Sequence, residues 1–166
     1  MPRSLQIVNE LAFRPSGLFI TNFNLNKESR EYDACSFTIN GKNIQYRLAK
    51  ITPTKPGQFV TLWKRNEKGI TAPFDASDDL HFIIISVIKG DLAGQFIFPV
   101  SVLASKGIIA QNGKDGKRGI RVYPQWDDTN NKQAKITQAW QLKYFLPSTC
   151  NGSMHTVVLK KLFNCI

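Results

Sequence analysis

The segment from residue 82 to residue 88 constrains the fold most, because every residue in it except Ser86 is apolar and most are β-branched. A strand with one solvated face alternates apolar and polar residues, so this unbroken run predicts a central strand buried on both faces. Gly90-Asp91 then separates the run from residues 94–98, which have the pattern of its hairpin partner.

Further strands are predicted around turn signals. Asn40-Gly41 is the strongest hairpin signal in the chain, because a two-residue turn of this kind needs positive φ at both positions. It joins residues 37–39 to a strand over residues 43–51. Residues 58–64 and 120–123 predict two more strands. Strands that follow one another closely and are joined by hairpins favour antiparallel pairing over a doubly wound α/β fold.

Helical periodicity is restricted to a few segments. Residues 4–12 carry a rough apolar stripe, and residues 130–145 carry another, with Thr129 as a plausible N-cap. Residues 100–105 and 155–163 predict two short helices. Since no repeat or low-complexity linker interrupts the chain, we expect one domain over residues 1–166. Its expected class is α+β, with a curved, mainly antiparallel sheet and flanking helices.

Several classes of protein are excluded by composition. No apolar run approaches the roughly 20 residues of a membrane span, and the first residues lack the apolar region of a signal peptide. We therefore expect a cytoplasmic protein without a membrane partner. Cys35, Cys150 and Cys165 are odd in number and form no zinc-binding pattern, so we expect reduced thiols and no metal or cofactor.

The charge of the chain favours a polyanionic partner. There are 22 Lys and Arg against 12 Asp and Glu, a formal net charge of +10. The positive charges are also clustered, because residues 34–66 contain no acid. The cations of that segment are Lys42, Arg47, Lys50, Lys55, Lys64 and Arg65, and those of a second basic segment are Lys106, Lys114, Lys117, Arg118 and Arg121.

A nucleic-acid interface is the leading hypothesis, with DNA or RNA as the partner. Neither face of the predicted strands over residues 43–51 and 58–65 is cleanly polar, so some of their cations should lie at a cleft. Trp63 or Tyr46 would stack on a base, and the glycine-rich loop 112–119 could form a backbone nest for an anion. The predicted site residues are Arg47, Lys50, Lys55, Trp63, Lys64, Arg65, Lys117, Arg118 and Arg121.

Two alternatives remain open. A divalent-metal nuclease or phosphodiesterase of the PD-(D/E)-x-K kind would use Lys50 with acids such as Glu31 and Asp33, although Leu48 stands where that pattern requires an acid. Asp75 and Asp79 could supply further carboxylates if the fold brings them near. In the other alternative, the basic face binds an acidic protein.

Four blocks of the sequence resemble the MepB family. They are residues 47–65 (RLAKITPTKPGQFVTLWKR), 94–99 (GQFIFP), 116–124 (GKRGIRVYP, followed by Trp126-Asp127) and 137–142 (TQAWQL, followed by Tyr144-Phe145). The resemblance extends from about Glu31 to Leu146. It implies a small cytoplasmic bacterial protein that is similar to nucleic-acid-binding proteins and has a fold like that of some nucleases. It supplies no catalytic residue.

Overall fold

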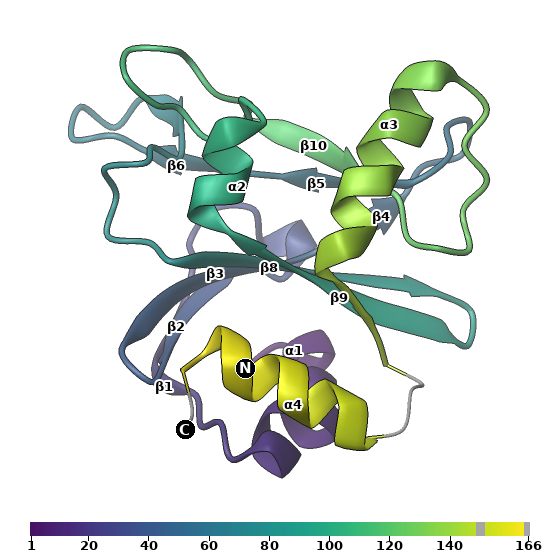
Figure 1. The fold of residues 1–166 in the computed structure, drawn as a ribbon. Helices are drawn as coiled ribbons and strands as arrows, with labels where there is room; N and C mark the ends of the chain where they lie inside the picture. Colours follow the sequence, from purple (N-terminus) through teal and green to yellow (C-terminus); the bar gives the residue numbers. More distant parts are fainter. Residues whose placement is uncertain (149–151, 165–166) are drawn as a thin grey trace.

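A six-stranded sheet lies at the centre of the computed structural model, which describes residues 1–148 and 152–164 (Figure 1). In spatial order its strands are β1 (Thr21–Leu25), β2 (Cys35–Ile39), β3 (Lys42–Leu48), β8 (Phe82–Lys89), β9 (Leu92–Pro99) and β11 (Phe145–Pro147). All neighbours are antiparallel except β3 and β8, which run parallel. The predicted α+β class with a mainly antiparallel sheet is confirmed.

The two hairpins in this sheet lie where the turn chemistry predicts them. Asn40 and Gly41 join β2 to β3 with φ of 48° and 73°, the positive values that the turn requires. Gly90 and Asp91 join β8 to β9. Residues 82–87 of β8 are all buried, as expected of a strand covered on both faces.

A smaller sheet stacks on one face of the large one. Its strands, in spatial order, are β10 (Gly119–Val122), β5 (Gln58–Thr61) and β4 (Lys50–Ile51), and a separate ribbon pairs β6 (Trp63–Arg65) with β7 (Thr71–Pro73). The predicted strand over residues 43–51 therefore divides at Ala49, so that β3 and β4 belong to different sheets. The predicted strand over residues 58–64 divides in the same way at Leu62, whose N–H donates to Arg118 O (2.9 Å).

Helices cover both faces of the large sheet (Figure 1). The first face, called the α4 face here, packs against α1 (Arg3–Val8), a π-helical turn η1 (Asn9–Phe13), a 3₁₀ turn η2 (Arg14–Ser16) and α4 (Gly152–Leu162). The second, called the small-sheet face, packs against the small sheet, α2 (Val100–Ser105) and α3 (Lys132–Gln141). Two further 3₁₀ turns are η3 (Arg30–Tyr32) and η4 (Leu142–Tyr144).

Helix boundaries differ from the predictions in the first helix, in α3 and in α4, which spans Gly152–Leu162 and not residues 155–163. The first helix changes to a π-helical turn at Asn9, and α3 ends at Gln141 and continues as η4. The N-cap of α3 is Asn131 and not Thr129, because the Asn131 side chain accepts a hydrogen bond from Ala134 N (2.8 Å). Outside the named strands, Ala110 makes a single β-bridge with Asp75.

Each face of the large sheet has its own hydrophobic core. Tyr46, Ile84 and Phe163 belong to the core on the α4 face, and Val60, Leu103 and Phe98 belong to the core on the small-sheet face. Cys35 is free and fully buried in the first core, whereas Cys150 and Cys165 lie outside the described residues. Across residues 1–148 and 152–164, none of the helices has the length and apolar character needed to cross a bilayer.

Candidate nucleic-acid interface

The outer face of the small sheet brings together cations and aromatic rings. Arg121, Phe59 and Lys50 are direct partners in the register of β10, β5 and β4, so their side chains leave the same face of that sheet. Lys50 Nζ lies 4.9 Å from the ring centroid of Tyr32, and that ring meets Phe59 edge to face at 6.2 Å. Lys50 and Arg121, two of the predicted site residues, thus lie on either side of the half-buried Phe59 ring.

The turn between β4 and β5 positions the Arg121 guanidinium. Arg121 donates to Thr52 Oγ1 (2.8 Å) and to the carbonyl oxygen of Pro56 (3.3 Å). Lys55, another predicted site residue, is exposed in the same turn. Neither acceptor is a carboxylate, and no ion pair to Arg121 is found among residues 1–148 and 152–164.

A groove runs between α2, β10 and α3. Its volume is about 450 Å³, and three cations line it: Lys106, Lys117 and Arg121. Among the residues that the structure describes, no Asp or Glu lines the groove. Trp140 lines the groove as well, with Lys106 Nζ 5.4 Å from its ring centroid, a distance typical of a cation–π contact. We refer to this feature below as the basic groove.

Gln141 holds α3 against the open edge of β10 and so defines the width of the basic groove. Its Nε2 donates to Arg121 O (2.9 Å), and its Oε1 accepts from Tyr123 N (2.9 Å). The side-chain amide therefore takes the place of a neighbouring strand at that edge. Gln141 is only 1% exposed, so both hydrogen bonds are shielded from water.

Three other predicted cations lie next to carboxylates of the same chain. Lys64 forms an ion pair with Asp78, and Arg118 Nη1 lies 3.4 Å from Asp115 Oδ2. Arg65 Nε lies 2.7 Å from Glu28 Oε1, and this hydrogen bond raises the pKa of Arg65.

Trp63, the predicted stacking residue, is half-buried. The Arg65 guanidinium lies 5.5 Å from its ring centroid and covers one face of the ring. Trp63 and Arg65 therefore form a unit of their own, apart from the basic groove.

The structure removes Arg47 and Tyr46 from the predicted site, because both side chains are buried. Arg47 is 1% exposed, and its Nη1 donates to Tyr46 O (2.8 Å) and to Gln45 Oε1 (3.3 Å), while Phe74 lies 6.0 Å away beneath the guanidinium. Burial lowers the pKa of Arg47 to about 10. Tyr46 is fully buried and donates to Ser86 Oγ (2.8 Å). Neither side chain offers a surface to a phosphate or a base.

Sequence reasoning did not place Lys106 and Trp140 at the interface. Lys106 belongs to the second basic segment, so its charge was a usable signal. Trp140 has the helical spacing of a core anchor and does pack on Phe98 (5.5 Å between ring centroids), which conceals its second contact with the groove. Only the position of α3 beside β10 brings the two residues together.

Two of the acids suggested for a metal site hold other parts of the chain in place. Asp33 accepts from Ser4 Oγ (2.7 Å), and Asp79 Oδ2 accepts from Asn43 Nδ2 (2.8 Å). Lys50 rests on the Tyr32 ring instead of facing a carboxylate pair. Within residues 1–148 and 152–164, no three His, Cys, Asp or Glu side chains are grouped so that they could hold a metal ion. No contact in the site therefore favours the metal-nuclease hypothesis.

Fold and site together define a small α+β protein with a cationic groove, and comparisons with known proteins place it in a family. The sequence matches the MepB-like family over residues 26–147, which is more than half of the chain, so the chain belongs to that family. The crystal structure of MepB is similar over 91% of this chain and 100% of its own, with 35% identity and a TM-score of 0.78. The resemblance inferred from the four sequence blocks is thereby confirmed.

A second solved structure is much more distant. The structure of a bacterial homing endonuclease aligns with 84% of this chain and 89% of its own, at 17% identity and a TM-score of 0.43. No curated protein matches the chain.

Proposed function

We propose that this protein binds nucleic acid through the basic groove and the adjoining outer face of the small sheet. The observation that carries the proposal is the lining of the groove, which contains Lys106, Lys117 and Arg121 and no carboxylate. A concave cationic surface without internal neutralisation attracts a polyanion, and phosphate contacts release counterions from the nucleic acid.

The aromatic residues of this surface suit a single strand. Trp140 and Tyr123 line the groove, and Phe59 lies between Lys50 and Arg121 on the neighbouring sheet face. Base–aromatic stacking contributes about 1–3 kcal/mol per base and tolerates any sequence. Binding should therefore depend on phosphates and stacking more than on the order of the bases.

A pair of neutralised lysines tests the proposal. Lys106→Gln with Lys117→Gln removes two groove charges, and loss of two phosphate contacts should reduce the slope of log K against log salt by about 1.4–1.8. Extrapolated from 1 M salt, that change corresponds to binding that is weaker by a factor of about 15–30 at 0.15 M salt. The measurement is fluorescence anisotropy with labelled single- and double-stranded oligonucleotides.

The matched control lies on the opposite side of the molecule. Lys160→Gln with Lys161→Gln makes the same change of charge on α4, on the other face of the large sheet (Figure 1). We expect the control to bind within about twofold of wild type. Equal weakening in both double variants would mean that only net charge matters, and absence of any binding by wild type would instead favour an acidic protein partner.

A further inference from the structure

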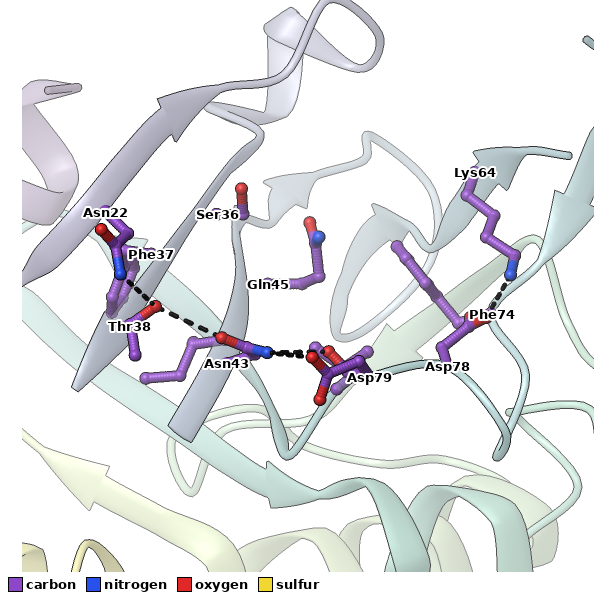
Figure 2. Close-up of a pocket in the computed structure, with 12 residues that line it drawn as sticks. Asn22, Ser36, Phe37, Thr38, Asn43, Gln45, Lys64, Phe74, Asp78 and Asp79 are labelled. Carbon is purple, nitrogen blue, oxygen red and sulfur yellow. Dashed lines mark hydrogen bonds and ion pairs between the residues drawn. The ribbon is translucent and has the colours of Figure 1, made fainter. Parts of the chain in front are cut away.

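A second pocket lies away from the basic groove, between the strands β1–β3 and the segment from β6 to residue 80 (Figure 2). Its volume is about 490 Å³, inside the range of about 300–1,000 Å³ found for small-molecule sites. Along β2 and β3, apolar side chains alternate with polar ones: Cys35, Phe37, Ile44 and Tyr46 pack into the core on the α4 face. The polar side chains between them therefore face this pocket.

The Gln45 amide is fixed in one orientation. Its Oε1 accepts from Arg47 Nη1 (3.3 Å) and from Asn26 Nδ2 (3.1 Å). Because a guanidinium only donates, the atom facing Arg47 must be the oxygen, and Nε2 is left to face the pocket. Buried Arg47, which forms no ion pair with a carboxylate among the described residues, thus acts as a positioning residue for Gln45.

Ser36 adds a second hydrogen-bonding group beside this amide. Ser36 and Gln45 are direct partners in the register of β2 and β3, and Figure 2 shows their side chains pointing the same way into the pocket. Within the part of the chain that the structure describes, neither Gln45 Nε2 nor the Ser36 hydroxyl has a hydrogen-bond partner. Two adjacent polar groups are therefore available to a ligand.

The charged groups of the pocket are already paired. Lys64 is bound to Asp78, and Asp79 accepts from Asn43 Nδ2. The lining holds one cation and two acids, and Arg47 behind its floor brings the sum of charges to zero. A neutral ligand fits this balance better than a phosphate does. The Phe74 ring lines the pocket beside these groups and gives it an apolar surface for a flat molecule (Figure 2).

We propose that this pocket binds a nucleobase, with Gln45 Nε2 donating to a ring carbonyl and Ser36 contacting the neighbouring edge atom. Bases outside a helical stack are recognised in this way, by hydrogen bonds to their edges and apolar contact with their faces. Adenine has no ring carbonyl, so guanine, cytosine and uracil should bind more tightly. The base belongs either to a free nucleoside or to a bound strand, and only the second source rests on the function proposed above.

The test uses free nucleosides first. Titration of ¹⁵N-labelled protein with guanosine, cytidine, uridine and adenosine should shift the side-chain NH₂ signals of Gln45, least with adenosine. Gln45→Leu removes the donor and should weaken binding about tenfold, the loss expected for one hydrogen bond in a shielded site. Ser36→Leu replaces the hydroxyl with a bulkier apolar side chain beside Gln45, without touching Arg47, and should abolish binding. Gln125→Leu, at an exposed position, is the matched control.

A second titration separates the two sources of the base. If nucleosides cause no shift but a single-stranded oligonucleotide shifts Gln45, and Ser36→Leu weakens that oligonucleotide, the base is part of a strand. If nucleosides bind and no oligonucleotide does, the inference of a base-binding pocket is supported and the proposed function of the basic groove is contradicted. Absence of Gln45 shifts with every nucleoside and oligonucleotide overturns the inference.

Discussion

Gln141→Leu should destabilise the protein through the edge of β10. Gln141 satisfies two backbone groups there, Arg121 C=O and Tyr123 N–H, each at 2.9 Å. Leucine has a similar volume but no polar atoms, so both groups lose their partner. A shielded polar group without a partner costs about 1–3 kcal/mol. Since Arg121 and Tyr123 are themselves half-buried, we expect the variant to lose about 2–4 kcal/mol of unfolding free energy.

Urea unfolding followed by tryptophan fluorescence measures this loss, and Gln133→Leu on the exposed side of α3 is the control. The control should change stability by less than about 0.5 kcal/mol, as surface substitutions usually do. Amide hydrogen exchange gives a local readout, because the Tyr123 N–H should be protected in wild type and exchange rapidly in the variant. A loss below about 0.5 kcal/mol with Tyr123 still protected would refute the role given to Gln141.

Three further predictions concern α3 and the buried ionisable groups. Asn131→Ala removes the N-cap of α3 and should cost about 1 kcal/mol in chemical unfolding; an unchanged midpoint would contradict the cap. Burial raises the pKa of Cys35 to about 12, so from pH 9 upward the unfolded chain loses a thiol proton that the folded chain keeps. Stability should therefore fall between pH 9 and pH 10, below the range where the lowered pKa of Arg47 opposes the trend, and Cys35→Ala should flatten this fall. Arg47→Met should leave the slope of log K against log salt unchanged, because buried Arg47 contacts no phosphate, and should leave the unfolding free energy equal or higher, because it replaces a buried charge that has no carboxylate partner among the described residues; a slope reduced by about 0.7–0.9 would return Arg47 to the interface.

Local patterns predicted the elements of this fold well. The Asn40-Gly41 turn fixed the β2–β3 hairpin, and the apolar run at residues 82–88 identified the central strand. The division of residues 43–51 between two sheets could not be predicted in this way. It depends on Ala49 N–H bonding to Ser86 O (2.9 Å), a contact between segments far apart in the chain. The parallel pairing of β3 with β8 has the same non-local origin.

The candidate site was predictable as a charge distribution and not as a surface. The sequence predicted Arg47 to lie on a strand at a cleft, but not that Phe74 lies beneath its guanidinium and that the side chain is buried. The sequence also did not predict which cations would pair with an acid from another segment, as Arg65 pairs with Glu28. The pocket around Gln45 was partly predictable, because polar and apolar residues alternate along the two strands within residues 35–46. An alternating pattern does not say, however, whether the polar face of a sheet meets solvent or a cavity.

The salt dependence of oligonucleotide binding by the wild-type protein tests the central claim most directly. If Lys106, Lys117 and Arg121 contact phosphates, with Lys50 and Lys55 extending the path, log K should fall with log salt at a slope of about −2 to −4.5. That result would support a phosphate-tracking groove with three to five contacts. A slope near zero, or no binding at low salt, would contradict it.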